Sequence, residues 1–345
     1  MPRRPRVLNR IVHELTFALH GCLPALVRSA DLVLVISPPL PLAWLVTWVG
    51  RLRRRPTWLY VQDIQPGTAI SLDMLRNRWL RRVLRWMERS TYRGADTILT
   101  LNGDMAEWIR GHVPDEKLGL LPLSIDVPAL LDHEGLAADV ARLPETDAIK
   151  GRSVVLYSGN LGVKHDPELL VECAAQMRAE TPDTAPLFVI AGDGARRHPV
   201  EEKIAEQQRA DPAFDHAICV PLVDSDLLPA RLAHASALVL LQRPQVHEFG
   251  TPSKLLSYLA SARPVIAAIA ADSEAARWLM EHDAARLVEP GDVNGLAEAV
   301  RWVLEHPREA HDMAMRGRAA VLDSFSHEVV RTEHYAPRFG HVQAP

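Results

Sequence analysis

Arg243 to Val265 reads RPQVHEFGTPSKLLSYLASARPV and carries the densest chemistry in the chain. A strand-like run, Ala237 to Gln242, leads into this stretch, and another, Val265 to Ile269, follows it. Between them, a Gly-Thr-Pro-Ser turn opens a helix that we predict over Leu255 to Ala260. Pro252 suits the first helical position, because its missing N–H would be unpaired there in any case.

The turn before this helix has the features of an anion site. The free N–H groups of a first helical turn, together with the positive end of the helix dipole, favour a phosphate or a carboxylate. Lys254 lies in that turn, where a cation opposes the dipole, and a bound diphosphate would explain its presence. The alternative is that Thr251 or Ser253 only caps the helix and that Lys254 is solvated.

The length and composition are those of an ordinary globular protein. With 345 residues, 48% of them hydrophobic and 24% charged, the chain is long enough for two domains with large cores. Its three cysteines, Cys22, Cys173 and Cys219, are far apart and lack metal-ligand spacing, so we expect a reduced cytoplasmic protein without a zinc site. The 15 histidines are also scattered without a repeated metal spacing.

Charge is distributed unevenly along the chain. Residues 1–94 hold 16 arginines, no lysine and five acidic residues, a formal charge of +11, whereas the remaining residues carry −15. We therefore expect an anionic partner for the first half. A membrane surface fits better than nucleic acid, because Leu40 to Val49 is apolar, contains two tryptophans and precedes the basic run Arg51 to Arg55. The alternative is a core helix with a solvated basic end; similarly, Arg76 to Arg93 is either a face for a lipid diphosphate or a solvated helix face.

Strand-like and helix-like segments alternate along the chain. The predicted strands are Leu32–Ile36, Thr57–Val61, Thr97–Leu101, Leu118–Leu121, Val154–Ser158, Leu187–Ala191, Ala217–Leu222, Ala237–Gln242, Val265–Ile269 and Ala285–Val288. This alternation predicts an α/β fold of two Rossmann-like domains with parallel sheets, joined by a polar linker at Asp132 to Gly151. Ligands of such sheets bind at the carboxyl ends of the strands. Those ends carry Gln62, Asp63, Gly159, Asn160, Gly192, Asp193, Gly194 and Leu222.

Motifs in both halves of the chain share a family resemblance. In the second half, YSGNLG at Tyr157, VIAGDG at Val189 and TPSKLLSYLASARPVIA at Thr251 are similar to the donor half of nucleotide-sugar glycosyltransferases. In the first half, DLVLVISPPL, YVQDIQPGTAISL and ADTILTLNGDM are similar in order and spacing. Together they resemble retaining family-4 enzymes of the GT-B fold, of the kind found in colanic acid and other exopolysaccharide biosynthesis. The resemblance covers most of the chain from about Leu8.

The resemblance implies a role for each matching residue. Gly159 lies where the donor diphosphate approaches the backbone, and a Cβ there would hold the phosphate away. Lys254 matches the lysine of a Pro-Ser-Lys turn that holds the diphosphate. The implied donor site is Gly159, Asn160, Lys164, Gly192, Asp193, Gly194, Leu222, Pro252, Ser253, Lys254 and Ser257. The implied catalytic residues, near positions that face the donor sugar, are Glu248, Asp63 and Gln62, with no metal ligand.

The sequence departs from the family pattern in three places. Ser257 stands where family members often carry a glutamate that accepts both ribose hydroxyls, and Pro122 to Asp126 lacks an expected asparagine. Nothing before Asp31 resembles the initial strand and Gly-rich loop of the family, so we expect the first domain to lack at least one βαβ unit. The expected domains are an incomplete acceptor-side domain at 1–145 and a donor domain at 151–325. A C-terminal helix or tail at 326–345 is expected to pack back on the first domain.

These patterns predict a cytoplasmic glycosyltransferase that is peripheral at the inner face of the plasma membrane. It would move a sugar from a nucleotide diphosphate sugar to a membrane-associated glycan or a polyprenyl-diphosphate-linked acceptor, without a cofactor, a metal or nucleic acid. The rival hypothesis, which Ser257 favours, is a catalytically impaired nucleotide-binding partner that regulates another transferase. A nucleotide-sugar epimerase is a third hypothesis. A dehydrogenase is disfavoured, because Gly192 to Arg197 lacks the third glycine of a dinucleotide fingerprint.

Overall fold

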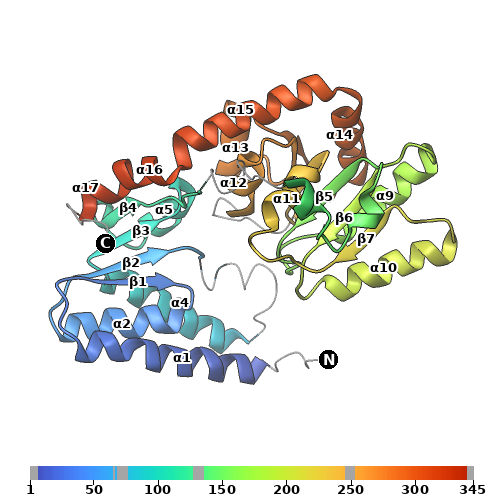
Figure 1. The fold of residues 1–345 in the computed structure, drawn as a ribbon. Coiled ribbons are helices and arrows are strands. Elements are labelled where there is room, and N and C mark those ends of the chain that lie inside the picture. Colours follow the sequence, from blue (N-terminus) through green and yellow to red (C-terminus); the bar gives the residue numbers. More distant parts are fainter. Residues whose placement is uncertain (1–6, 65–66, 68–76, 127–135, 245–252, 340–345) are drawn as a thin grey trace. The chain divides into compact units, whose positions relative to one another are not determined.

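The structure is a computed structural model, and it describes residues 7–64, 67, 77–126, 136–244 and 253–339 (Figure 1). The chain divides into two compact units. Unit 1 comprises Met1–Pro122, Glu248–Thr251 and His334–Pro345, and unit 2 comprises Leu123–His247 and Pro252–Glu333. Each unit is built on its own parallel sheet with helices packed against it, which confirms the predicted α/β class.

Unit 1 holds a four-stranded parallel sheet in the order β1-β2-β3-β4. Its strands are β1 (Val33–Ser37), β2 (Thr57–Val61), β3 (Thr97–Thr100) and β4 (Leu118–Leu120). The central strands β2 and β3 are buried along most of their length, as expected when helices cover both faces of a parallel sheet. β1 lies at one edge of this sheet, and Leu34 and Ile36 on one of its faces are exposed.

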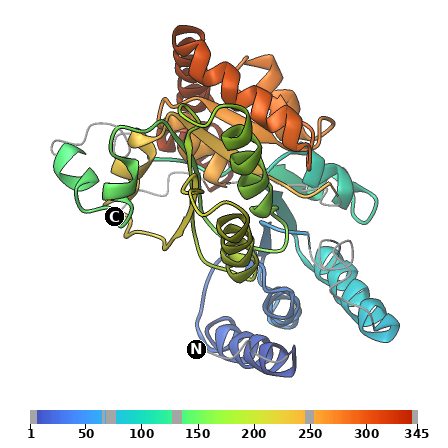
Figure 2. The ribbon, with the colours of Figure 1, turned by 90° about the vertical axis from the view of Figure 1, so that its right-hand side faces the viewer.

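Helices cover both faces of the unit 1 sheet (Figure 1). On one side lie α1 (Val7–Val27), α2 (Leu40–Leu52) and α4 (Arg78–Gly94), and α2 packs against both of the others (Figure 2). On the other side lie α5 (Gly103–Arg110) and α17 (Ala336–Phe339). Asparagine side chains fix two of the helix starts: Asn77 accepts the first free N–H groups of α4, and Asn102 accepts one of α5.

The C-terminal helix α17 packs on the sheet of unit 1. The Phe339 ring lies with its centroid 4.8 Å from that of Trp58 on β2, and Arg338 Nη1 donates to the Leu120 carbonyl of β4 at 2.6 Å. The chain reaches α17 through α16 (His327–Val329) and a single π-helical segment, Val330–Tyr335. The last described residues therefore belong to unit 1, although the segment that leads to them belongs to unit 2.

Unit 2 holds a six-stranded parallel sheet in the order β10-β9-β8-β5-β6-β7. Its strands are β5 (Val154–Ser158), β6 (Leu187–Ala191), β7 (Ala217–Val220), β8 (Ala237–Leu241), β9 (Val265–Ala268) and β10 (Arg286–Val288). Residues alternate between two cores, one on each face: Val155 and Phe188 belong to one, and Leu156 and Val189 to the other. All ten strands predicted from the sequence are thus confirmed, although β3, β4, β7, β8 and β9 end one or two residues earlier than expected.

The two faces of the unit 2 sheet are covered by different helices (Figures 1 and 2). The helices packed on the sheet are α9 (Glu168–Glu180), α10 (Arg197–Ala210), α11 (Leu228–His234), α12 (Ser253–Ala260), α13 (Glu274–Glu281), α14 (Val293–Glu305) and α15 (Pro307–Phe325). Side chains of α9, α10 and α14 fill the core that contains Val155, and side chains of α11, α12 and α13 fill the core that contains Leu156.

Part of the stretch that we expected to be a polar linker is folded. It contains α7 (Leu136–Val140) and α8 (Thr146–Ile149), and Leu143 and Ile149 are buried in the core of unit 2. Glu145, at the start of α8, accepts two hydrogen bonds from the buried guanidinium of Arg231 on α11, at 2.7 and 2.8 Å. A buried carboxylate with a bidentate partner is satisfied, and this pair fixes the segment on unit 2.

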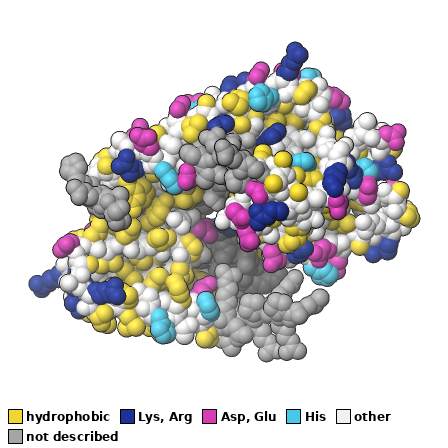
Figure 3. Space-filling model, in the orientation of Figure 1, with side chains coloured by type: hydrophobic (Ala, Val, Ile, Leu, Met, Phe, Trp, Pro, Cys, Tyr) yellow, Lys and Arg dark blue, Asp and Glu magenta, His cyan; other side chains and the backbone are white. Residues whose placement is uncertain are grey.

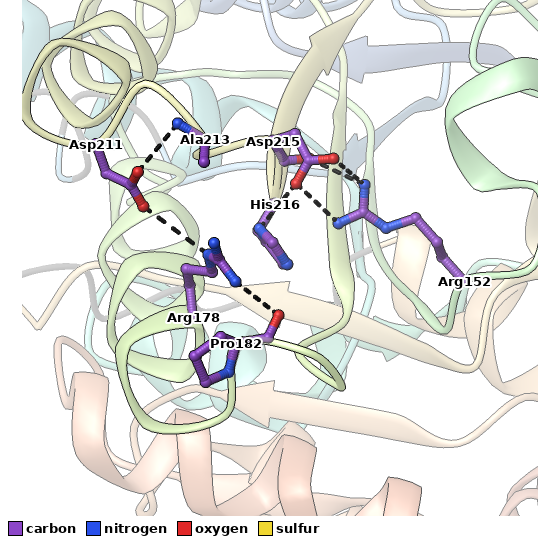
Figure 4. A network of polar contacts seen from close by, with 7 residues as sticks. All are labelled: Arg152, Arg178, Pro182, Asp211, Ala213, Asp215 and His216. Atoms are coloured by element: carbon purple, nitrogen blue, oxygen red, sulfur yellow. Dashed lines mark hydrogen bonds and ion pairs between the residues drawn. The ribbon is translucent and has the colours of Figure 1, made fainter.

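A polar network ties segments together at the amino end of the same sheet (Figure 4). Asp215 precedes β7 and lies 3.0 Å from Arg152, which precedes β5, and 3.0 Å from Nδ1 of its neighbour His216. Arg178 of α9 lies 3.8 Å from Asp211. Burial lowers the pKa of His216, so the imidazole stays neutral at neutral pH. The network lies at the strand ends opposite to those where ligands of such sheets bind, and we assign it to stability.

Candidate functional site

The connections of the unit 2 sheet reverse direction between β5 and β8. β5 pairs with β6, the next strand in sequence, on one side and with β8 on the other. Ligands of doubly wound sheets bind outside the carboxyl ends of the strands at such a switch point. Among the described residues, the pairing of β5 with β8 joins only Val155 to Ala237 and Leu156 to Leu238. The ladder therefore ends before the strands do, and it leaves the carboxyl ends of β5 and β8 without mutual pairing.

Tyr258 of α12 completes the hydrogen bonding where that ladder ends. Its buried hydroxyl accepts the Ser158 N–H at 2.7 Å and donates to the Ser158 carbonyl at 2.9 Å. Both backbone groups would otherwise be buried and unpaired on the side that faces β8. Burial raises the pKa of the Tyr258 phenol, which stays protonated. This side chain fixes α12 against the end of β5.

Glycines allow the loops after β5 and β6 to approach each other closely. A Cβ on Gly192 would lie 2.1 Å from the Gly159 carbonyl oxygen, and a Cβ on Gly194 would lie 2.5 Å from the Leu161 carbonyl oxygen. Gly159 and Gly194 also have φ values of +147° and +145°, which favour glycine. The Leu161 N–H donates to the Asp193 carbonyl at 2.8 Å and holds the two loops together. These three predicted residues therefore form one surface beside the switch point.

Lys254, in the first turn of α12, lies beside Gly159. Its Nζ donates to the Tyr157 hydroxyl at 2.7 Å and lies 4.0 Å from the centroid of that ring. A Cβ on Gly159 would lie 3.0 Å from this Nζ, so the glycine leaves room for the ammonium group. The Tyr157 hydroxyl donates in turn to the Asn160 carbonyl at 2.8 Å. The structure thus brings together the lysine and the glycine that the sequence places in one anion site.

Further basic groups lie close to this point. The Arg243 N–H donates to the Lys164 carbonyl at 3.0 Å, and its Nε donates to the His165 carbonyl at 3.2 Å. His165 is buried, and its Nδ1 lies 2.9 Å from the Leu241 carbonyl, an acceptor. Burial, together with the nearby charges of Lys254 and Lys164, lowers the pKa of His165 to about 4, so the ring is neutral and Nδ1 carries the proton. Lys254, Lys164 and Arg243 thus lie near the carboxyl ends of β5 and β8, where Arg243 also pairs with Asp166 at 3.5 Å.

The other predicted donor residues differ in their exposure and in the loops or helices that carry them. Asn160 and Asp193 are exposed on the two paired loops, and Ser253 is exposed at the start of α12. Ser257 lies one helical turn after Ser253 on α12 and is partly buried. Leu222 is exposed after β7, which is an edge strand two positions from β5.

Four other predicted residues are not part of the group around Lys254 that is described above. Glu248 and Pro252 lie outside the described residues. Gln62 and Asp63 follow β2 in unit 1, where both are partly buried and the Gln62 N–H donates to the Ser37 carbonyl at 2.8 Å. They lie at the carboxyl end of a parallel strand, as predicted.

Neither a metal centre nor a membrane span is found in the described part of the chain. Within those residues, no group of three or more His, Cys, Asp or Glu side chains could hold a metal ion. Within the same residues, no helix combines the length and the apolar composition needed to cross a bilayer.

Comparison with known families accounts for both halves of the chain. The family described as "Glycosyl transferases group 1" matches residues 152–306, and the "Glycosyl transferase 4-like domain" matches residues 1–123. The chain belongs to the group 1 glycosyltransferases of the GT-B fold. Among solved structures, a crystal structure of HepE from Anabaena in complex with UDP-glucose has a TM-score of 0.71 at 14% identity, covering 95% of this chain and 82% of that one.

Two curated proteins are related to this glycosyltransferase in sequence. WcaI of Escherichia coli (strain K12), which is named as a colanic acid biosynthesis glycosyl transferase, is 25% identical over 267 residues, 75% of this chain and 63% of that protein. The alpha-D-kanosaminyltransferase of Streptomyces kanamyceticus is 27% identical over 188 residues, 54% of this chain and 45% of that protein. The matched region therefore spans less than two thirds of the length of these curated relatives.

Three residues of this candidate site were not singled out from the sequence. Tyr157 accepts a hydrogen bond from Lys254, Tyr258 of α12 bonds the last residue of β5, and His165 bonds the Leu241 carbonyl at the end of β8. Tyr157 and Tyr258 occupy apolar positions of a strand and a helix, where an aromatic ring is expected for packing alone. Their hydroxyl partners come from segments 97 and 100 residues away, so no local pattern indicates them.

Proposed function

We propose that this protein is a glycosyltransferase whose donor is a nucleotide diphosphate sugar. Its acceptor is a membrane-associated glycan or a polyprenyl-diphosphate-linked glycan in polysaccharide biosynthesis. The observation that carries the proposal is the position of Lys254 Nζ beside Gly159, in the first turn of a helix at the switch point of the unit 2 sheet. A diphosphate there would meet free N–H groups, an ammonium group and a backbone without a Cβ.

The proposed chemistry is electrostatic. When the acceptor oxygen bonds to the sugar C1, the bond between C1 and the diphosphate oxygen breaks, its electron pair passes to the diphosphate, and the proton of the acceptor hydroxyl passes to the departing diphosphate. The N-terminus of α12, Lys254 and Lys164 would stabilise the charge that develops there, so the chain itself supplies the cations without a tightly held metal. Glu248, Gln62 and Asp63 are the proposed residues that face the sugar, and retention of the anomeric configuration is part of the proposal.

Two comparisons support the substrate class. The related fold of HepE is known with UDP-glucose, which is a nucleotide diphosphate sugar. WcaI, named for colanic acid biosynthesis, supports a polysaccharide pathway. A cytoplasmic protein held peripherally at an anionic membrane, through residues 1–94, would meet such an acceptor at the surface.

The test is a panel of nucleotide diphosphate sugars, incubated with the protein and with membranes that contain lipid-linked glycans. We expect release of nucleoside diphosphate together with a glycosylated lipid product for one donor. Product analysis separates transfer from epimerisation, because an epimerase changes the donor sugar without forming a glycoside. Release of neither product with any donor would contradict the proposed transferase.

One observation favours a second candidate, a catalytically impaired nucleotide-binding partner that regulates another transferase. Ser257 offers a hydroxyl one turn after Ser253 on α12, where a carboxylate could accept both ribose hydroxyls. The same panel separates the two candidates. Saturable nucleotide binding by calorimetry without turnover would support the regulator, and Ser257→Glu would then be expected to strengthen nucleoside binding.

A further inference from the structure

A groove lined by arginines lies between α2 and α4 of unit 1. It has a volume of about 690 Å³, and Arg51 of α2 contributes to its wall together with Trp86 and Ser90 of α4. The remaining lining residues are arginines of α4, namely Arg78, Arg81, Arg82, Arg85, Arg89 and Arg93. The groove lies wholly within unit 1.

The arginines follow the helical repeat and therefore share one face of α4. Neighbours three or four positions apart lie side by side on a helix, and like charges at that spacing repel each other. In the described part of the chain, no ion pair joins Arg78, Arg82 or Arg89 to a carboxylate, whereas exposed arginines of unit 2 such as Arg142 and Arg316 have carboxylate partners. These three arginines carry positive charge that an external anion can pair with.

The single acidic residue of α4 does not neutralise this groove. Glu88 is buried, and its Oε1 accepts the Tyr92 hydroxyl at 3.2 Å. Burial raises the pKa of Glu88 to about 7, so much of it is uncharged at neutral pH. Arg51 is fixed in the groove by a hydrogen bond of 2.6 Å from Nη2 to the Arg93 carbonyl, which uses no counter-charge.

The two helices that form the groove also carry exposed apolar side chains. Trp79 and Trp86 of α4 are 70% and 57% exposed, and Trp48 and Leu52 of α2 are 60% and 68% exposed. The Trp86 ring lies 5.7 Å from that of Trp44, across the contact between the two helices. Figure 3 shows hydrophobic side chains gathered over the same unit, where Figure 1 labels β1, β2, α1 and α2. Tryptophans beside arginines are the composition of protein surfaces that sit at a membrane–water interface.

We infer that the arginine groove between α2 and α4 is a docking site for the surface of an anionic lipid bilayer. From Arg78 to Arg93 the helix rises about 22 Å, which is too long for one diphosphate and suits an array of headgroups. The arginines complement the phosphates, and the exposed tryptophans and Leu52 enter the headgroup region. Nucleic acid offers the same phosphates, but Leu52 would have no partner there.

This inference deepens the membrane contact of the proposed function, and its test is independent of sugar transfer. The full chain is sedimented with vesicles of phosphatidylcholine alone and of equimolar phosphatidylcholine and phosphatidylglycerol, without any donor. We expect binding to the anionic vesicles only, weakening as the Debye length shortens to about 8 Å at physiological salt. Transfer without vesicle binding would overturn the docking site alone, and vesicle binding without transfer would overturn the transferase alone.

The critical variant combines Arg82→Gln, Arg85→Gln and Arg89→Gln. Each basic residue near an anionic surface contributes about fivefold, so the triple variant should bind the anionic vesicles about a hundredfold more weakly. The matched control removes three paired arginines of unit 2 and should bind as wild type. Its substitutions are Arg142→Gln, Arg301→Gln and Arg316→Gln.

Three further measurements distinguish a bilayer surface from other ligands of the groove. If the triple variant unfolds by circular dichroism, hydrogen exchange on the wild type replaces it: anionic vesicles should slow exchange in α4, and equal exchange with neutral vesicles would refute the site. Displacement from the vesicles by stoichiometric pyrophosphate would show a pocket for a single diphosphate instead. Tighter binding to a single-stranded oligonucleotide than to vesicles, lost in the same variant, would show a nucleic-acid surface.

Discussion

Replacing Tyr258 by phenylalanine tests how the proposed donor site is held together. The substitution removes one hydroxyl from a buried position and leaves the Ser158 N–H and carbonyl without their 2.7 and 2.9 Å partners. Each unpaired buried backbone group costs about 1–3 kcal/mol, so for the two groups we expect unit 2 to lose about 2–6 kcal/mol of stability. The first turn of α12 would also be less firmly held, and Lys254 would move relative to Gly159. We expect the affinity for a nucleoside diphosphate to fall about tenfold, or about 1.4 kcal/mol.

Hydrogen exchange and calorimetry measure the two effects separately. Exchange should accelerate in β5 of the variant, and titration should give the weaker affinity. Tyr60→Phe is the matched control: this buried hydroxyl donates to the Leu121 carbonyl of unit 1 at 2.9 Å, and its loss should cost about 1 kcal/mol without changing nucleotide affinity. Wild-type exchange in β5 together with wild-type affinity in Tyr258→Phe would refute the proposed anchoring, and an equal loss of affinity in Tyr60→Phe would show that the effect is not local.

Three other substitutions probe separate parts of the chain. Lys254→Ala should weaken the binding of a nucleoside diphosphate by calorimetry about ten- to a hundredfold but leave nucleoside binding nearly unchanged, and Lys203→Ala on α10 should change neither. Gly192→Ala should destabilise unit 2 in thermal unfolding by about 1–3 kcal/mol, because its Cβ would lie 2.1 Å from the Gly159 carbonyl; wild-type stability would mean that the loop can move. Glu88 has its pKa raised by burial from 4.5 to about 7, so the stability that it contributes is complete below pH 4.5 and is lost as the pH rises to 7. Glu88→Gln should therefore stabilise unit 1 by about 3 kcal/mol above pH 7 and flatten that pH dependence in denaturant melts, and a decrease in stability there would contradict the pKa.

The fold follows from local sequence patterns because each strand is short, apolar and bounded by polar or glycine residues. Val154–Ser158 and Leu187–Ala191 are buried at every position, as parallel strands covered on both faces must be. The stretch from 136 to 149 was misjudged because its helices are short and its composition is polar. Glu145 is stable in the interior only through Arg231, which lies 86 residues away, and no local pattern contains that pairing.

The candidate site was predictable at positions where the backbone conformation or a close approach requires one particular residue type. Gly159, Gly192 and Gly194 were singled out because loops that approach a ligand or each other exclude a Cβ, and the distances that a Cβ would have confirm the crowding. Lys254 was singled out because a cation opposes the dipole at a helix start. The hydroxyl contacts of Tyr157 and Tyr258 depend on the tertiary structure, which brings α12 to the end of β5, and a sequence pattern does not hold that information.

Both proposed anion sites place positive charge where the helix alone disfavours it. Lys254 opposes the dipole of α12 and is held by the Tyr157 hydroxyl rather than by a carboxylate. On α4, four arginine pairs at a spacing of four residues repel each other, at a cost of about 1–2 kcal/mol in total. A bound anion relieves each of these costs, so part of its binding energy comes from strain that is present before it arrives. The two sites differ in the length of the anionic ligand that they can contact. One turn of α12 presents N–H groups to a single diphosphate, whereas the arginine groove follows α4 along most of its length. This difference is why we connect the first with the donor and the second with a surface.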